Sequence, residues 1–381
     1  MGFIEVEQVV KRYGDFTALR GVDLTVEEGE FLCLLGPSGC GKTTLMRSIA
    51  GLTTIEGGRI SVGGQRFSEP GLTIPPERRK LGMVFQSYAL WPHMTVFGNI
   101  AYTLKTNKWP KAEIKDRVRE VLDIVGLPGL EDRYAGQLSG GQMQRVAVAR
   151  SLAPEPRVLL FDEPLSNLDS KLREKMRFEL RQIQQRVGIT ALYVTHDQSE
   201  AMVVADRIAL MKDGELVQLG SAKDLYEKPR SPFAAEFMGV TNFVSAEVVR
   251  TDGSTVHLRL PGDVTIAGRL ATGSETAAGS DGPVTMTVAV RPEHLRTSTT
   301  QPAESAETNV LPGVVDDIVY LGNLADLYVR VGDTVLRTQA VPDDLDGWTT
   351  GMDVWVSVEE RRVRAVAGER TTTDERAKAT A

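Results

Sequence analysis

The chain has 381 residues, a length that predicts two or three domains rather than one compact core. Its composition is typical of a globular protein, with 41% hydrophobic and 25% charged residues. The formal net charge is −7, which argues against a protein whose main role is to cover a nucleic-acid backbone, because that role requires a surplus of Lys and Arg.

Targeting signals are not found in the sequence. No apolar run approaches the roughly 18 residues that suggest a membrane span. Glu5 and Glu7 stand where a signal peptide carries basic residues, and Val6 occupies a position where myristoylation requires Ser or Thr. The two cysteines, Cys33 and Cys40, provide neither a disulfide framework nor a metal-ligand spacing. We therefore expect a cytosolic chain.

The first part of the chain, residues 1–239, alternates β-rich apolar runs with helical patterns, which predicts an α/β domain with a largely parallel sheet. The expected strands are Glu30 to Leu35, Val158 to Phe161, Thr190 to Thr195 and Arg207 to Met211. Between them, residues 87–157 are expected to form a helical subdomain. One helix is expected after Pro110, where apolar residues recur at helical spacing from Ile114 to Val125.

The second part, residues 240–367, consists of short alternating segments separated by turns, which predicts a small all-β domain. Two stretches rich in Thr, Ser, Ala and Gly, Ala271 to Gly282 and Thr297 to Asn309, are expected to be exposed loops. Residues 368–381 are expected to be a disordered tail.

The segment GPSGCGKTT, Gly36 to Thr44, follows an apolar strand and precedes a helical pattern, which is the context of a phosphate-binding loop. Gly36, Gly39 and Gly41 let the backbone curl so that its N–H groups point at phosphate oxygens. Lys42 then supplies a cation and Thr43 a hydroxyl ligand for Mg²⁺. A Gly-rich turn without a ligand is the alternative, and this strand-loop-helix context disfavours it.

Two further motifs contain residues suited to metal binding, catalysis or anion binding. The run VLLFDEP ends in Asp162, which can hold Mg²⁺, and Glu163, which can polarise the attacking water. Strand alternation sends these neighbours in opposite directions, so we expect different roles. In LSGGQ, Leu138 to Gln142, Ser139 is a good N-cap, and Gly140 with Gly141 exposes backbone amides at a helix start, which gives a second anion-binding surface.

These motifs, with Gln86, SNLD at Ser166 to Asp169 and His196, occur in an order and spacing that resemble ABC-transporter nucleotide-binding subunits over Ile4 to Gly239. The resemblance implies a P-loop NTPase fold that binds ATP and Mg²⁺. It implies that the nucleotide is held by the residues Tyr13, Gly36, Pro37, Ser38, Gly39, Cys40, Gly41, Lys42, Thr43, Thr44, Ser139, Gly140, Gly141, Gln142 and Asp169. Thr43, Gln86 and Asp162 are the implied metal ligands.

Individual roles also follow from the resemblance. Tyr13 is expected to stack on adenine, and Gln86 to touch Mg²⁺ or the lytic water and to sense the membrane partner. His196 resembles the switch histidine that contacts the γ-phosphate, so Glu163, His196 and Gln86 are the expected catalytic residues. Asp169 resembles a residue that reaches across a dimer. In this family two copies sandwich two ATP molecules between one chain's phosphate loop and the other chain's LSGGQ, so hydrolysis is expected to require a homodimer.

Two other segments carry the resemblance to importers. The apolar stretch Met83 to Tyr102 is either core or a groove for a membrane subunit, and its similarity to importer ATPases favours permease docking near Tyr88 to His93. RPEHL at Arg291 to Leu295 and GVVDDIVYLG at Gly313 to Gly322 resemble a C-terminal OB-like regulatory domain of the TOBE type. OB barrels also bind oligonucleotides, but this segment has little basic and aromatic interleaving, so regulation or dimerisation is favoured.

The predicted function is therefore the ATP-hydrolysing motor subunit of an ABC importer, a peripheral protein at the cytoplasmic face of the membrane. Its expected partners are permease subunits and, indirectly, an extracytoplasmic substrate-binding protein, with no nucleic acid. FMGVTNF at Phe237 to Phe243 and LDSKLREKMRFEL at Leu168 to Leu180 resemble polyamine or ferric-iron importers. A sugar importer is the alternative, a soluble ATPase acting on ribosomes or DNA is a more distant one, and a regulatory ligand of the β domain stays open.

Cys40 lies inside the expected phosphate loop, next to Lys42 and a helix N-terminus. This setting predicts a partly ionised, reactive thiol, unlike Cys33 on its expected buried strand. A merely tolerated small residue is the equally weighted alternative.

Overall fold

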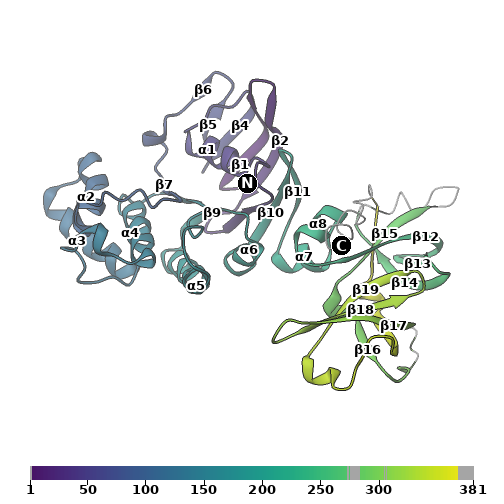
Figure 1. Cartoon of the computed structure of the whole chain (residues 1–381). Coiled ribbons are helices and arrows are strands. Elements are labelled where there is room, and N and C mark those ends of the chain that lie inside the picture. Colours follow the sequence, from purple (N-terminus) through teal and green to yellow (C-terminus); the bar gives the residue numbers. More distant parts are fainter. Residues whose placement is uncertain (1, 273, 275–283, 304, 306, 368–381) are drawn as a thin grey trace. The chain divides into compact units, whose positions relative to one another are not determined.

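The computed structural model describes residues 2–272, 274, 284–303, 305 and 307–367, and it divides into two compact units, Met1–Ala222 and Lys223–Ala381 (Figure 1). The sequence placed the domain boundary near Gly239, whereas in the structure the helices α7 (Ala222–Glu227) and α8 (Pro232–Phe237) lie with the second unit. No helix among the described residues is both long and apolar enough to cross a membrane.

A six-stranded sheet in the order β11-β10-β3-β9-β8-β7 forms the centre of the first unit. Its strands are β3 (Phe31–Leu35), β7 (Leu81–Val84), β8 (Val158–Asp162), β9 (Thr190–Thr195), β10 (Arg207–Lys212) and β11 (Glu215–Gly220). All neighbours are parallel except β10 and β11. Strands β3, β8 and β9 are buried at every residue, which explains their continuous apolar sequences. The four expected strands and the parallel sheet are confirmed.

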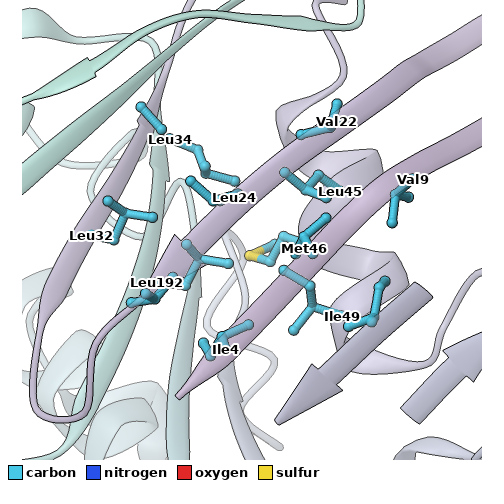
Figure 2. Packing of buried hydrophobic residues seen from close by; sticks show 14 of the residues in the cluster. Ile4, Val9, Val22, Leu24, Leu32, Leu34, Leu45, Met46, Ile49 and Leu192 are labelled. Atoms are coloured by element: carbon cyan, nitrogen blue, oxygen red, sulfur yellow. The ribbon is translucent and has the colours of Figure 1, made fainter. Parts of the chain in front are cut away.

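A second, antiparallel sheet in the order β2-β1-β4-β5-β6 was not predicted. Its strands are β1 (Ile4–Tyr13), β2 (Phe16–Val26), β4 (Gly57–Val62), β5 (Gln65–Glu69) and β6 (Leu72–Thr73). Figure 2 shows apolar side chains of β1 and β2 packed with Leu45, Met46 and Ile49 of helix α1 (Lys42–Ala50) and with side chains of β3 and β9. Helix α1, which begins at the expected phosphate loop, is therefore fixed within one hydrophobic core.

The helical subdomain consists of α2 (Val96–Thr106), α3 (Lys111–Ile124), the 3-10 turn η2 (Ala135–Gln137) and α4 (Gly140–Leu152), all inside the expected range 87–157. The helix expected after Pro110 is α3, and its apolar face from Ile114 to Leu122 is buried. Figure 1 shows α2, α3 and α4 gathered apart from α1. Helices α5 (Ser170–Val187) and α6 (Gln198–Val204) follow β8 and β9 in the chain.

The second unit contains a closed five-stranded barrel, β12-β13-β14-β21-β15, as expected for an OB-like domain. Its strands are β12 (Asn242–Asp252), β13 (Thr255–Leu260), β14 (Val264–Leu270), β15 (Thr285–Val290) and β21 (Arg364–Val366). A further sheet, β16-β20-β17-β18-β19, is inserted in the sequence between β15 and β21. It consists of β16 (Arg296–Ser298), β17 (Thr308–Tyr320), β18 (Ala325–Val331), β19 (Thr334–Ala340) and β20 (Asp353–Glu359).

The expected loops are only partly found. Thr297 and Ser298 belong to β16 and pair with β20, and Thr308 and Asn309 begin β17, so the ends of the second expected loop are strands. The sequence missed them because Thr and Ser suit a half-exposed strand as well as a loop. Most of Ala271 to Gly282, and the tail 368–381, lie outside the described residues.

Candidate nucleotide-binding site

The expected phosphate loop connects β3 to α1, and two of its glycines are required by close packing. A Cβ on Gly36 would lie 2.3 Å from the Met211 carbonyl oxygen of β10. Gly41 has a left-handed φ of 103°, and a Cβ there would lie 2.6 Å from the Ala18 carbonyl oxygen. The loop therefore curls tightly against neighbouring strands because it carries no side chains at these points.

The same loop gathers positive charge. Gly41 is the N-cap of α1 and has no side chain to accept from the first-turn amides, so these N–H groups and the helix dipole can bind an anion. Lys42 as a residue is 4% exposed, and its ammonium donates to the carbonyls of Gly36 (2.7 Å) and Pro37 (2.8 Å). Lys42 is thus held inside the loop. Phosphate oxygens could replace the backbone carbonyls as acceptors of hydrogen bonds from its ammonium group.

Asp162 ends β8 next to the start of α1. Burial raises the pKa of the Asp162 carboxyl, while Arg47, at 3.8 Å, and a hydrogen bond with the Thr43 side chain lower it. A divalent cation would favour the charged carboxylate, and carboxylate and hydroxyl oxygens suit Mg²⁺. The described residues contain no cluster of three or more His, Cys, Asp or Glu side chains, so Mg²⁺ here would depend on phosphate and water oxygens as well.

Glu163 and His196 meet although they are far apart in the sequence. The β8–β9 register pairs Asp162 with Val194, and the Glu163 N–H donates to the Val194 carbonyl at 3.1 Å. Glu163 Oε2 then lies 3.3 Å from His196 Nδ1. Glu163 has a left-handed φ of 44°, a strained conformation that separates its direction from that of Asp162. The two carboxylates consequently face different partners.

A buried network of hydrogen bonds and ion pairs, not predicted from the sequence, lies behind His196. Glu200 is 3% exposed and accepts hydrogen bonds from Tyr193 Oη (2.9 Å) and Thr195 Oγ1 (2.7 Å). Asp197 caps α6 and pairs with Arg177 at 3.0 Å. These contacts fix both sides of His196. The N-cap at Asp197 could have been predicted, whereas the Tyr193–Glu200 contact depends on how α6 packs on β9.

The SNLD segment lies beside these residues. Ser166 Oγ donates to the Glu163 carbonyl at 2.9 Å, and Asn167 Nδ2 donates to the Gln86 carbonyl at 2.9 Å. Gln86 is exposed just after β7. Asp169 accepts from the Leu172 N–H at 3.0 Å and thereby caps α5. The structure therefore brings Gln86, Glu163 and SNLD together within one chain.

Tyr13 stands at the end of β1 with half of its surface exposed. Lys11 Nζ lies 5.1 Å from the centre of the Tyr13 ring. Phe16, paired with Tyr13 across the β1–β2 turn, is 59% exposed. Phe16 was not predicted as a site residue, although two aromatics flanking a Gly-Asp turn were a visible signal. Together they offer exposed rings on which a base could stack.

LSGGQ begins α4 as expected. Ser139 Oγ accepts from the Gln142 N–H, and Gln142 Oε1 accepts from the Ser139 N–H, which forms a capping box. A Cβ on Gly140 would lie 2.9 Å from Leu168 Cδ2, so the segment packs closely on the SNLD region. Because α4 lies apart from α1 (Figure 1), the structure does not bring LSGGQ to the phosphate loop of the same chain.

The proposed docking segment is held firmly by two other helices. Arg150 of α4 donates to the carbonyls of Tyr88 and Ala89, and Trp91 packs on Tyr102 of α2 with ring centres 4.5 Å apart. Tyr88 is itself 8% exposed, so its ring belongs to the core, whereas Pro92 and His93 are on the surface. Arg150 was not foreseen, because an arginine in a helix gives no sequence signal for a backbone contact.

The expectation of a reactive Cys40 is wrong. Cys40 is 3% exposed and belongs to the core of the first unit. Burial raises the pKa of its thiol, and this outweighs Lys42 Nζ, 3.7 Å from the sulfur. The loop turns the side chain inward, so proximity to a cation does not ionise it. Cys33 is buried, as expected.

Comparison with known proteins matches residues 19–166 to the ABC transporter family and residues 288–366 to the TOBE domain. A spermidine/putrescine import ATP-binding protein PotA from Ruegeria pomeroyi is 46% identical over 343 residues, which are 89% of both chains. An Fe(3+) ions import ATP-binding protein FbpC from Brucella suis is 51% identical over 261 residues, 68% of this chain and 73% of the relative. The chain belongs to the importer ATP-binding subunits of the ABC family.

The importer ATPase also resembles solved structures. CbiO1 from Clostridium perfringens, part of the ABC transporter complex cbiONQ, matches with a TM-score of 0.55 at 31% identity, over 59% of this chain and 90% of that chain. The dimeric bacterial ABC transporter cassette MJ0796 matches with a TM-score of 0.50 at 34% identity, over 57% and 98%. The predicted fold and ATPase class are thereby confirmed, and ATP-binding subunits of this kind work with membrane permease components.

Proposed function

We propose that this importer ATPase uses the pair Glu163 and His196, beside the phosphate loop, to hydrolyse ATP and so power uptake of a polyamine. The 3.3 Å contact between these side chains is the observation that carries the hydrolytic part of the proposal. Ferric iron is the second candidate cargo. The PotA relative matches over 89% of this chain, including most of the C-terminal unit, whereas the FbpC relative matches over 68%, which favours the polyamine.

Each site residue has a role that its surroundings support. The first-turn amides of α1 and the Lys42 ammonium bind the phosphates, because both present positive charge to an anion at the start of the helix. Thr43 and Asp162 would hold Mg²⁺, which neutralises phosphate charge when bound. Glu163 polarises the attacking water, and His196 is placed to contact the γ-phosphate. Tyr13, together with Phe16, supports adenine.

The complete site is proposed to need a second copy of the chain. Ser139, Gly140 and Gly141 start a 13-residue helix whose N-terminus can bind an anion, yet this helix lies apart from the phosphate loop of its own chain. In a head-to-tail homodimer the partner would supply LSGGQ, and Asp169 would lie at the interface. The surface near Pro92 and His93 would dock on permease subunits at the cytoplasmic face of the membrane, with an extracytoplasmic binding protein delivering cargo.

The test is transport by a reconstituted system. The chain is assembled in proteoliposomes with its permease and binding protein, and ATP hydrolysis and uptake are measured with spermidine, putrescine or ferric iron. We expect a polyamine to stimulate hydrolysis and to accumulate, and Glu163→Gln to abolish both. Stimulation by ferric iron alone would identify ferric iron as the cargo, and stimulation by none of the three would contradict both candidates. Hydrolysis that survives Glu163→Gln would contradict the proposed mechanism.

A further inference from the structure

The C-terminal unit contains a cavity of about 210 Å³ outside the barrel interior. Its walls come from α7, α8, the 3-10 turns η3 (Pro292–His294) and η5 (Glu360–Arg362), and strands β15 and β21. This cavity lies wholly in residues that the ATPase chemistry does not use. It is also adjacent to the RPEHL motif, whose Arg291 and His294 line it.

The cavity is strongly cationic. Five of its lining side chains are positively charged, namely Lys223, Arg291, Arg361, Arg362 and Arg364. Glu227 is the one carboxylate in the lining, and Glu293 and Glu359 contact lining residues from outside. Even when all three carboxylates are counted, positive charge is in excess. Cations gathered in a partly enclosed space concentrate the field and attract anions.

The protein satisfies the guanidinium groups to different extents. Arg291 donates to the Val240 and Tyr226 carbonyls and to Thr241 Oγ1, whereas Arg364 and Arg362 are less fully bonded. Arg364 donates from Nε to the Glu227 carbonyl at 3.0 Å, and its two terminal nitrogens have no hydrogen-bond partner among the described residues. Arg362 contacts Glu227 at 3.3 Å through one terminal nitrogen. Burial lowers the pKa of both Arg291 and Arg364, since each guanidinium loses water without gaining a carboxylate in hydrogen-bond contact. Arg364 and Arg362 therefore line the cavity with N–H groups that have no partner among the described residues.

The cavity has room for more than a single ion. Its volume of about 210 Å³ is many times the roughly 10 to 15 Å³ that a single water needs by the same measure. Pro229, Ala235 and Ala289 add apolar wall that can contact a carbon skeleton. His294 Nδ1 is buried without a hydrogen-bond partner among the described residues, so one further polar atom at this cavity is unsatisfied. Burial and the charge of Arg362 lower the pKa of His294, which favours the neutral imidazole at pH 7.

We propose that this cavity is a binding site for a small organic anion carrying two or more negative charges on phosphate or carboxylate oxygens. A planar guanidinium group can donate two parallel hydrogen bonds to the oxygens of a phosphate or of a carboxylate. The same arginines could therefore bind either kind of anion. Arg364 and Arg362 are the main ligands, and Glu227 opposes binding by competing for Arg362. A polycation such as spermidine is excluded from this site by charge, so the proposal is independent of the cargo.

The test measures binding of citrate, glycerol 3-phosphate and inorganic phosphate to the full chain by isothermal titration calorimetry. The nucleotide site is first saturated with Mg²⁺ and a non-hydrolysable ATP analogue, with free Mg²⁺ held constant, so that the phosphate loop cannot bind the probes. We expect at least one probe to bind, with Arg364→Gln weakening it at least tenfold. Which probe binds identifies the source of the anion as a carboxylate or a phosphate.

Two variants separate binding from folding. Glu227→Gln removes the competing carboxylate and is expected to tighten binding several-fold, which a purely structural role would not do. Arg330→Gln is the matched control. Arg330 is an exposed cation of the same unit that pairs with Asp316, and both residues lie on the inserted sheet and not on the barrel. The Arg330→Gln substitution should leave anion binding unchanged. The proposal is overturned by no binding of any probe at millimolar concentration, by equal loss in Arg330→Gln, or by spermidine binding that depends on Arg364.

Discussion

Glu163 occupies a backbone conformation that a non-glycine residue adopts at a cost of roughly 1 to 3 kcal/mol. This strain turns the carboxylate towards His196, while Asp162, one residue earlier, remains beside Thr43 and Arg47. Two adjacent carboxylates thus obtain separate surroundings. Strand alternation led us to expect different directions for the two carboxylates, but Glu163 lies just beyond the end of β8, and its left-handed backbone provides the separation instead. The contact with His196 depends on the pairing of β8 with β9, which α5 separates in the chain.

Replacement of Glu163 by Gln tests this division of roles. The amide keeps the size of the side chain but cannot take a proton from water, so turnover should fall by about 10² to 10⁴-fold. ATP affinity should change little, because Lys42 and Asp162 are intact, and an ATP-bound dimer should accumulate. Steady-state hydrolysis, nucleotide binding and gel filtration check these results. A monomer with ATP and Mg²⁺ in the presence of permease would count against the dimer.

Cys40 gives a second prediction at this scale. Because burial raises the pKa of its thiol, the reactive thiolate is scarce at pH 7 to 8. Maleimide should label Cys40 in the native chain much more slowly than in urea, and ATP should add little protection. Because burial penalises the thiolate in the folded chain, stability should be unaffected while the thiol is neutral and should fall as the pH rises from the pKa of the unfolded thiol through the raised native pKa. Mass spectrometry that finds rapid, ATP-sensitive labelling would contradict the buried position.

Sequence motifs predict a site well where the chemistry is local and poorly where it depends on packing. The phosphate loop and the Ser139 cap are set by consecutive residues, and the structure has both as expected. The direction of the Cys40 side chain depends on a core shared by several elements. The Glu200 network likewise exists only once α6 packs on β9.

At the scale of elements, one buried side chain joins helix α1 to the antiparallel sheet. Arg79 is 1% exposed, and its guanidinium donates to the Ser48 and Ile49 carbonyls at the end of α1 and to Phe67 and Ser68 of β5. Burial lowers its pKa to about 10, so it stays charged at neutral pH. The antiparallel sheet escaped prediction partly because such a contact leaves no periodic pattern in the sequence.

Arg79→Met should destabilise the first unit by about 3 kcal/mol or more, since several buried carbonyls lose their donor at once. Urea unfolding followed by circular dichroism measures this loss. The neighbouring Arg78 is exposed, so Arg78→Met is the matched control and should change stability by less than about 0.5 kcal/mol. Equal effects in the two variants would contradict the role of Arg79.

At the scale of the whole molecule, the change in sequence texture after Thr241 correctly predicted two architectures in one chain. The position of the division was harder to predict, because α7 and α8 have ordinary helical sequences and only their packing assigns them to the second unit. The proposed site for hydrolysis combines the phosphate loop of one chain with the LSGGQ segment of a second chain. Substitutions in each of these two segments can test this arrangement.

Ser139→Arg and Lys42→Ala should separate the two halves of the composite site. Lys42→Ala should lose ATP affinity, because the phosphate charge then faces only backbone dipoles. Ser139→Arg should bind ATP normally and lose hydrolysis, since the added side chain blocks the partner's γ-phosphate. Equilibrium binding of a fluorescent ATP analogue, measured beside turnover, distinguishes the two. Equal loss of ATP binding would mean that LSGGQ belongs to the phosphate loop of its own chain.

The closure of the barrel by β21 has a consequence for how the chain reaches its native state. Strand β21 joins β14 and β15 after the whole inserted sheet, and it pairs residues as distant as Arg269 and Arg364, which are 95 positions apart. Contacts of such long range form slowly, because a large loop must close before they stabilise anything. The ATPase unit, made first, can fold during synthesis, while β14 and β15 keep unpaired edges until β21 arrives. Newly made chains should therefore depend on chaperones mainly through their C-terminal half.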